Sequence, residues 1–361
     1  MTRRSLVAAG VVVLLAVTPA AHAAHAARGK GPKPKDPPAS YVKVTGGARD
    51  YWVYTPSGRA PHRGRALVVY LHGCSQGDPE FEDVNAALAF GTRWNELAEE
   101  KNFVVAYPIQ RTYDMEHPEA VEGNGATCWN WFLPQHQSRG SGEPAIIAGI
   151  TDDVIAAGGI DRDRVYVAGA SAGADMAVVM AATYPDVYRA MAAWAGCAFR
   201  DCADVTGRLA YEAMGTHARP VPAALFQGTA DALNNYGLDQ TLLQQQLGTA
   251  DWADDGALDG SVERVPVTEQ RDAEGEVAPD PTKACVENRN FPCAGPAIGW
   301  TSYPVTIDRY LFAGTPRVAV EHWTIHGLNH NYPHGDPAST FTEPTGPDVT
   351  RAAWAFFVAA R

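Results

Sequence analysis

The sequence predicts an α/β fold in which a mostly parallel central sheet carries helices on both faces. Three observations lead to this prediction. Short runs rich in β-branched and aromatic residues alternate with longer helical patterns. Several of the short runs are apolar throughout, which is typical of strands that are buried on both faces. One of them ends in Gly-x-Ser-x-Gly directly before a helical stretch, a junction found at the top of sheets of this kind.

The first half of the chain is expected to contain two strands, a helix, a third strand and a second helix. Residues 50–55 and 66–71 are aromatic and aliphatic runs of strand length. Residues 84–101 place large apolar side chains at helical spacing, and 103–108 is an apolar run that fits a buried strand. Residues 146–159 are typical of a helix that ends at a glycine.

The second half continues the alternation with four strands and two helices. The first of these helices is rich in Ala and Met and stops near a proline, which cannot continue a helix. The strands are expected at 164–169, 190–196, 223–228 and 318–325, and the helices at 172–183 and 348–361.

Composition and the N-terminal pattern predict one folded domain behind an export signal. Of 361 residues, 46% are apolar and 19% are charged, an ordinary globular composition. Residues 1–26 combine two early arginines, a short apolar run and two Ala-x-Ala sites, which predicts a signal peptide cleaved after Ala23 or Ala26. The apolar run is too short for an anchor that spans about 30 Å of hydrocarbon. Residues 27–40, rich in Pro and Lys, are expected to be an exposed tail before a catalytic domain at 41–361.

The charge distribution argues against nucleic-acid and membrane partners. The formal net charge is −12, whereas proteins that bind nucleic acids or anionic membranes carry basic patches. Much of the negative charge is local, because residues 251–280 hold ten Asp and Glu. We expect an acidic insertion at about 237–300, either a solvated surface excursion or part of a wall over the site.

Six cysteines in a chain predicted to be exported favour disulfides. The chain contains no Cys-x-x-Cys pair, which argues against a zinc ribbon. Other pairings and buried free thiols stay open as alternatives. The pairing that sequence proximity favours is Cys197–Cys202, Cys285–Cys293 and, by remainder, Cys74–Cys128.

The strongest chemical signal is the sequence GASAG at 169–173. It follows a predicted strand and opens a predicted helix, which is the setting of a nucleophile elbow. The flanking glycines permit a sharp turn that lifts the Ser171 hydroxyl above the sheet, where the positive end of the helix dipole points at it. The alternative is a small-residue turn without chemistry. A second serine between glycines, Ser141, has no strand before it.

A nucleophilic serine needs a base, and the base needs an acid that orients it. In this architecture the acid and the histidine follow the serine in that order, each in a loop after a strand. Asp231 lies three residues past the run 223–228 and is the expected acid, with an Asx-turn residue as the alternative. His330 lies in a loop after the run 318–325 and is the expected base, with His334 as the second choice.

Four histidines recur at a four-residue spacing, which on a helix would align them toward a metal ion. Gly327, Asn329 and Pro333 argue against a helix there, so no metal site is expected. The four are His322, His326, His330 and His334. Hydrolysis through a serine acyl-enzyme needs no cofactor, and none is expected.

Two backbone amides are expected to stabilise the oxyanion of a tetrahedral intermediate. Residues 69–76 (VYLHGCSQ) contain a strand end, a His-Gly pair and a tight turn, similar to loops that supply such an amide. The expected donors are the amides of Cys74 and of Ala172, the residue after the predicted nucleophile. A Cys74–Cys128 disulfide would hold this loop rigidly against residues 128–132.

Six motifs in a fixed order carry a family resemblance. They are LHGCSQ (71–76), YPIQ (107–110), CWNWF (128–132), DRDRVYVAGASAGADMA (161–177), QGTAD (227–231) and GLNH (327–330). Together they resemble the secreted poly(3-hydroxybutyrate) depolymerase-like esterases, a group of α/β-hydrolases related to feruloyl and acetylxylan esterases. The resemblance covers about residues 41–335. It implies an α/β-hydrolase fold, the triad Ser171, Asp231 and His330, the two oxyanion amides, and ester hydrolysis through an acyl-enzyme.

Two departures from this family bear on the substrate. Polymer-degrading members often carry a linker and a polymer-binding domain after the catalytic one, and no such module is recognisable after residue 340. The family's aromatic after the catalytic histidine, often within His-Ala-Trp, is replaced by Asn331-Tyr332. Polyhydroxyalkanoate (3-hydroxybutyrate) polymers or oligomers are the expected substrates, and feruloyl or acetyl esters of plant cell-wall polysaccharide are the alternative. An acyltransferase or a non-catalytic binding module on the same fold is the alternative of another class.

Aromatic side chains are candidates for an apolar substrate surface. Trp129 and Trp131 are preferred because they follow the cysteine expected to tie to the oxyanion loop, and Tyr332 because it follows the predicted base. Trp300 and Trp323 are further candidates. Core packing is the alternative for all of them, since large aromatic side chains tend to be buried.

Overall fold

The computed structural model describes residues 40–45, 48–57, 59–76, 91–111, 123–271, 303–337, 339 and 341–360. Several predicted features lie outside the described residues: the signal peptide, the tail up to residue 39, Trp300 and the Cys285–Cys293 pair. Within the described ranges, none of the helices has the length and apolar character needed to cross a membrane.

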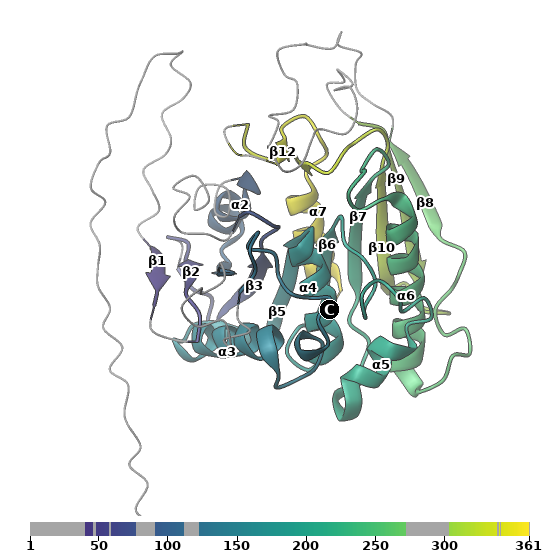
Figure 1. Cartoon of the computed structure of the whole chain (residues 1–361), viewed down its shortest axis with the longest axis horizontal. Helices are drawn as coiled ribbons and strands as arrows, with labels where there is room; N and C mark the ends of the chain where they lie inside the picture. The colour runs from purple at the N-terminus through teal and green to yellow at the C-terminus, as the bar shows by residue number, and fades with distance from the viewer. Residues whose placement is uncertain are drawn as a thin grey trace, which may run out of the picture.

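Ten strands of the described chain form one sheet at the centre of the molecule (Figure 1). They are β1 (Tyr41–Val44), β2 (Tyr51–Tyr54), β3 (Arg65–Leu71), β4 (Val104–Pro108), β5 (Ile160–Ala170), β6 (Met191–Trp194), β7 (Ala223–Gly228), β8 (Val267–Arg271), β9 (Val305–Leu311) and β10 (Val318–Ile325). Their order is β1-β2-β4-β3-β5-β6-β7-β10-β9-β8. From β4 to β10 every neighbouring pair is parallel, whereas both edges are antiparallel. The predicted mostly parallel sheet is confirmed.

Helices cover both faces of this sheet, as predicted (Figure 1). Two helices, α2 (Trp94–Lys101) and α7 (Val349–Ala359), pack on one face. The other face is covered by α3 (Gly142–Ala156), α4 (Ala172–Thr183), α5 (Arg208–Met214) and α6 (Tyr236–Asp255). Short connections add 3-10 turns at Pro134–His136 and Gly215–His217 and a small parallel pair, β11 (Tyr332–Pro333) with β12 (Thr342–Glu343).

Burial on both faces explains why the central strands are apolar without alternation. In β5, Val165 and Val167 point into the core beneath α3 and α4, while Tyr166 and Ala168 point into the core beneath α2 and α7. A strand between two hydrophobic layers has no solvated face, so each position favours an apolar side chain. Phe357 of α7 stacks on Tyr166 with ring centroids 4.6 Å apart.

Some elements differ from the sequence-based expectation. The helix expected at 84–101 is helical from Trp94 onward in its described part, and the helix expected at 146–159 begins at Gly142. The described part of the expected insertion, 237–271, holds most of helix α6 and the edge strand β8, whose side chains are mostly exposed. Asp251 is buried there and accepts hydrogen bonds from backbone amides of the turn after α6.

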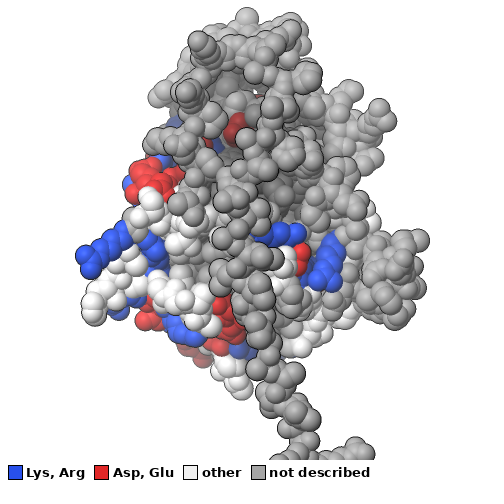
Figure 2. Space-filling view, turned by 90° about the vertical axis from the view of Figure 1, so that its left-hand side faces the viewer, with Lys and Arg blue, Asp and Glu red and all other residues white. Residues whose placement is uncertain are grey.

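The side of the molecule that carries β1 shows charges of both signs. In Figure 2, lysine and arginine side chains are interspersed with aspartate and glutamate among the described residues of that face. One such contact joins Lys43 to Asp50, with 3.2 Å between the nitrogen and a carboxylate oxygen.

Candidate active site

Ser171 stands at the junction of β5 and α4 with a backbone conformation that few residues adopt. Its φ is 54° and its ψ is −127°. The glycines around it are sterically required. A Cβ on Gly169 would lie 2.2 Å from the carbonyl oxygen of Gly173, and a Cβ on Gly173 would lie 2.0 Å from that of Leu71. The elbow therefore folds as the sequence predicted, with the serine side chain raised at the C-terminal end of the parallel strands.

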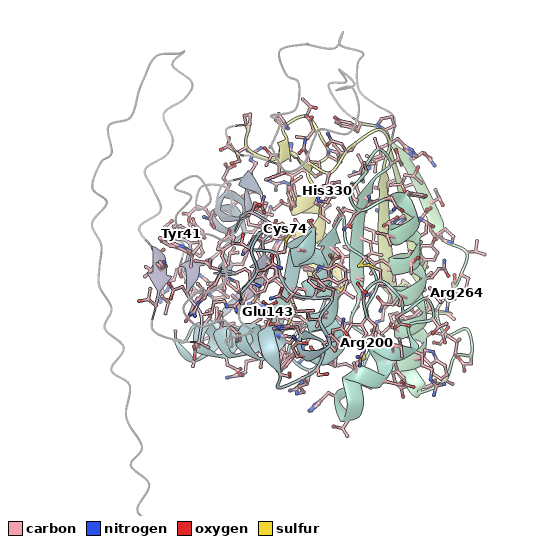
Figure 3. All side chains as sticks on the ribbon, in the orientation of Figure 1. Tyr41, Cys74, Glu143, Arg200, Arg264 and His330 are labelled. Atoms are coloured by element: carbon pink, nitrogen blue, oxygen red, sulfur yellow. A yellow bond between two sulfur atoms is a disulfide. The ribbon has the colours of Figure 1, made fainter. Side chains whose placement is uncertain are left out.

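His330 bridges Ser171 and Asp231. It lies in the loop after β10, with Nε2 3.0 Å from Ser171 Oγ and Nδ1 2.7 Å from Asp231 Oδ2. Because the carboxylate can only accept, Nδ1 carries the proton and Nε2 is the acceptor for the serine hydroxyl. The three side chains predicted from the sequence thus meet in one hydrogen-bonded line. Figure 3 shows His330 near Cys74, at the upper ends of the central strands.

The Asp231 carboxylate is buried and held by donors of its own loop. Oδ1 accepts the amides of Leu233 at 2.9 Å and Asn234 at 3.0 Å. Oδ2 accepts the side-chain amide of Gln227 at 3.3 Å in addition to His330. These donors stabilise the negative charge and fix the carboxylate toward the imidazole. Sequence reasoning missed Gln227, although it is the first residue of the QGTAD motif.

The loop after β3 lies against the elbow and is tied down by a disulfide. Cys74 is bonded to Cys128 across a sequence separation of 54, with their Cα atoms 4.1 Å apart. Within the described chain, the amides of Cys74 and Ala172 donate to no other residue. Cys74 lines the pocket beside Ser171, and Ala172 follows Ser171 at the start of α4, where the first amides of a helix have no partner within the helix.

A buried histidine orients the peptide that contains the Cys74 amide. His72 Nδ1–H donates to the carbonyl oxygen of Gly73 at 2.7 Å, and its Nε2 accepts the amide of Gln110 at 3.0 Å. Burial lowers the pKa of His72 to about 4, an effect that the bond to Gly73 opposes and nearby Arg49 reinforces. The imidazole is therefore neutral near pH 7, with its proton on Nδ1.

A buried polar network supports this loop from below. Glu143 accepts from the backbone amide of Asn130 at 2.7 Å and from its side-chain amide at 3.0 Å. Gln110 donates to both Glu143 and the carbonyl of Cys128, and the Arg49 guanidinium lies 3.6 Å from Glu143. In Figure 3, Glu143 lies below Cys74. The network links the segment after β4, helix α3 and the segment around Cys128, and sequence reasoning did not identify it.

A pocket of about 130 Å³ opens beside Ser171. It exists because β5 carries small residues between large ones: Ala168 is paired with Tyr70 of β3, and Ala170 with Trp194 of β6. These side chains face the same layer of the core. The lining residues are Tyr70, Gly73, Cys74, Gln76, Thr92, Ala170, Ser171, Trp194, Leu233, His330, Tyr332, Phe341 and Thr342.

The aromatic residues predicted to bind substrate are only partly found at this pocket. Trp129 is fully buried and donates from Nε1 to the His72 carbonyl at 3.1 Å, so the expectation of a substrate surface there is wrong. Trp131 packs against the core and edge-on to Phe132, and it is not among the lining residues. Tyr332 does line the pocket, while its hydroxyl is bonded to Thr350 at 2.8 Å. Trp323 is buried as well.

The other three histidines of the four-residue series have separate partners. His322 is buried against Asp239 at 2.8 Å, His326 lies 2.9 Å from Thr306 Oγ1, and His334 lies 2.9 Å from Arg93. Their side chains therefore do not converge, because the segment is a strand followed by a loop and not a helix.

Two of the three predicted disulfides lie in the described chain. Besides Cys74–Cys128, Cys197 is bonded to Cys202 in the loop after β6. Among the described residues every cysteine is in a disulfide.

Comparison with curated proteins finds relatives over part of the chain. Poly(3-hydroxyalkanoate) depolymerase C of Paucimonas lemoignei is 37% identical over 171 residues, which is 47% of this chain and 36% of that protein. Feruloyl esterase B of Neurospora crassa is 34% identical over 37% of this chain and 39% of its own length. Acetylxylan esterase A of Emericella nidulans is 33% identical over 40% of this chain and 41% of its own length. The matched part thus spans less than half the length of each of these relatives.

The fold and the family agree with these relatives. The solved structure of the acetyl xylan esterase from Aspergillus awamori superposes with a TM-score of 0.52 at 19% identity, over 81% of this chain and 94% of that one. This likeness shows a shared α/β-hydrolase fold. The family model described as esterase PHB depolymerase matches residues 49–255. Because that match covers more than half of the sequence, the chain belongs to the PHB depolymerase esterase family.

Proposed function

We propose that this chain is a secreted serine esterase that hydrolyses esters of short aliphatic acids through an acyl-enzyme. The observation that carries the proposal is the line Ser171 Oγ, His330 and Asp231, at 3.0 Å and 2.7 Å, beside a pocket. A nucleophile, a base and an orienting acid within hydrogen-bond reach are what acyl transfer requires. Membership of an esterase family supports the same reaction.

The proposed mechanism has two half-reactions. His330 Nε2 removes the Ser171 proton as Oγ attacks the ester carbonyl, and Asp231 stabilises the imidazolium through Nδ1–H. The amides of Cys74 and Ala172 donate to the oxyanion. His330 then protonates the departing alcohol, which leaves the acyl group on Ser171. Water activated by His330 attacks this ester, and collapse of the second intermediate returns the proton to Ser171.

Pocket size supports a small acyl group. A cavity of roughly 150 Å³ accommodates benzene, so a pocket of about 130 Å³ holds a chain of about four carbons. A feruloyl group, with a substituted ring and a propenoyl arm, is larger than this volume and would extend beyond the pocket. We therefore propose 3-hydroxybutyrate polymers or oligomers as the first substrate class. Acetyl esters of xylan are the second, because an acetyl group also fits.

A substrate panel tests this choice. The purified protein should hydrolyse 3-hydroxybutyrate oligomers and p-nitrophenyl butyrate, and Ala170→Leu, which fills the pocket, should lose butyrate while keeping part of its activity on p-nitrophenyl acetate. A preference for methyl ferulate over these esters would contradict the proposed acyl size. A preference for acetylated xylan over the oligomers would favour the second substrate class.

Export is part of the proposal. It is supported by the signal-like pattern at residues 1–26 and by two disulfides, which persist in oxidising compartments. Sequencing the N-terminus of protein recovered from the medium should give a start at Ala24 or Ala27. Recovery of the intact N-terminus in the cell fraction would contradict it.

A further inference from the structure

The turn after β3 contains one polar side chain that the proposed mechanism leaves without a role, that of Gln76. It is half-buried and lines the pocket together with Ser171 and His330. Its Oε1 accepts the amide of Gly73 at 2.9 Å. A backbone amide can only donate, so this bond fixes which end of the carboxamide faces Gly73.

Among the described residues, the opposite end of the Gln76 carboxamide is a donor without a partner. Nε2 carries two hydrogens, and within the described chain it donates to no residue. Because Oε1 is already bonded to Gly73 and Nε2 is not bonded, the amide hydrogens of Nε2 are available to a ligand in the pocket.

The Gln76 carboxamide and the nucleophile face the same small space. A Cβ on Gly73 would lie 3.3 Å from Gln76 Oε1 and 3.5 Å from Ser171 Cβ. The carbonyl oxygen of Ala170 lies 3.4 Å from the same position. Gln76 Oε1 and Ser171 Cβ are thus both neighbours of Gly73, so the carboxamide and the nucleophile border the same part of the pocket. An ester attacked by Ser171 would bind in the pocket that both residues line.

The peptide that holds Gln76 in place is itself fixed at both ends. Trp129 Nε1–H donates to the carbonyl of His72 at 3.1 Å, and the amide of the same peptide, on Gly73, donates to Gln76. The next peptide is fixed by the His72 ring through the Gly73 carbonyl. The carboxamide is therefore held before substrate arrives, and its use as a donor requires little reorganisation.

We infer that Gln76 Nε2–H is a third oxyanion donor, beside the backbone amides of Cys74 and Ala172. The inference rests on the proposed function and adds a side chain to its site. Asn and Gln side chains serve in oxyanion holes, and loss of one donor lowers kcat on the order of 10²- to 10³-fold. Because the interaction strengthens as negative charge develops, its loss should lower kcat and leave KM nearly unchanged.

Two variants separate this role from that of holding the loop. Gln76→Leu removes both the acceptor for Gly73 and the donor. Gln76→Glu keeps the acceptor but replaces the donor with a carboxylate that repels the oxyanion. The inference predicts that kcat on p-nitrophenyl butyrate falls about 10²-fold or more in Gln76→Leu and further in Gln76→Glu. It also predicts that a boronic acid, which forms a tetrahedral adduct on the serine, loses affinity in the same order.

The competing outcomes are distinct. If Gln76→Glu keeps nearly wild-type kcat while Gln76→Leu loses it, the side chain only holds Gly73 and the donor role is wrong. If both variants stay within threefold of wild type, Gln76 has no part in turnover. Thermal unfolding of each variant reports whether the protein is still folded. The matched controls are Gln135→Leu and Gln135→Glu, which make the same substitutions at an exposed glutamine. The proposed function is tested independently of Gln76 by comparing the ester-hydrolysis rates of the wild type and of Ser171→Ala.

Discussion

At the scale of single residues, the chemistry depends on where three side chains are held. Ser171 is fixed by a strained elbow, Asp231 by the amides of its own loop, and His330 by the two of them. The triad could be predicted from the sequence because each member follows a recognisable strand end. Gln227 and His72 could not, because their roles depend on contacts made in the folded loops: Gln227 donates to the Asp231 carboxylate, and His72 accepts the backbone amide of the distant Gln110.

His330 and His334 should respond differently to substitution. His330→Ala should lower kcat by about 10⁴-fold or more, as Ser171→Ala does, because members of a triad act as a unit. His334→Ala should keep most of the activity, since His334 contacts Arg93 and Asp348 and not the serine. Steady-state kinetics on p-nitrophenyl butyrate check this. An inactive His334→Ala beside an active His330→Ala would overturn the assignment of the base.

His72 should make stability depend on pH. Its pKa is about 4 in the folded protein because of burial, whereas an unfolded histidine titrates near 6.5. Between about pH 6.5 and pH 4, His72 is protonated in the unfolded chain but neutral in the folded protein. Its contribution to the free energy of unfolding is therefore complete above about pH 6.5 and is lost as the pH falls toward 4. This one group accounts for roughly 3 kcal/mol over that window.

Urea unfolding at pH 7 and pH 4.5 measures the effect of His72. The loss of stability on acidification should be smaller in His72→Asn than in wild type, since the variant lacks the titrating group. Equal losses in the two proteins would show that His72 is not the group responsible.

At the scale of elements, the apolar pattern predicted the strands that lie between two hydrophobic layers. Strand β8 (VTEQR) was not predicted, because it is an edge strand with mostly exposed side chains. Helix α6 was missed for a different reason. Several of its buried positions are polar, such as Gln245 and Asp251, so the sequence shows no continuous apolar stripe there. Gln245 donates to Thr249 one turn along the helix, and Asp251 accepts an amide of the turn that follows it. The pocket likewise depends on strand register, which sets Ala170 against Trp194.

Helix α7 should be held by its apolar face and not by its surface ion pair. Phe357 is fully buried against Tyr166, so Phe357→Ala should cost about 3–5 kcal/mol of unfolding free energy. Arg351 forms an exposed pair with Glu100 at 2.7 Å, and Arg351→Ala should cost less than about 1 kcal/mol. Urea denaturation of both variants compares them. A larger loss for Arg351→Ala would contradict this account of the helix.

At the scale of the whole molecule, two segments that are distant in sequence meet at the nucleophile. The loop after β3, bridged to Cys128, supplies one wall, and the loop after β10 supplies the base. The family resemblance predicted this arrangement. It did not predict which aromatics face the substrate, because Trp129 serves the oxyanion loop from within the core.

The Cys74–Cys128 disulfide should support turnover as well as stability. Closing a loop of this length is worth roughly 4 kcal/mol in the chain-entropy model. A shift of about 1 Å in the Cys74 amide could also cost on the order of 10²-fold in rate. The double Cys→Ser variant should therefore lose kcat at temperatures well below its unfolding midpoint. Full activity under those conditions would mean that the bridge acts on stability alone.

The central claim is that Ser171, activated by His330, forms the acyl-enzyme, and labelling with a fluorophosphonate tests it most directly. Peptide mass spectrometry after a short exposure should find one equivalent of label on Ser171, with the loss of esterase activity following the extent of labelling. Labelling should be slow in His330→Ala, because the serine then lacks its base. Label on another serine such as Ser141, or hydrolysis that persists when Ser171 is fully modified, would contradict the account.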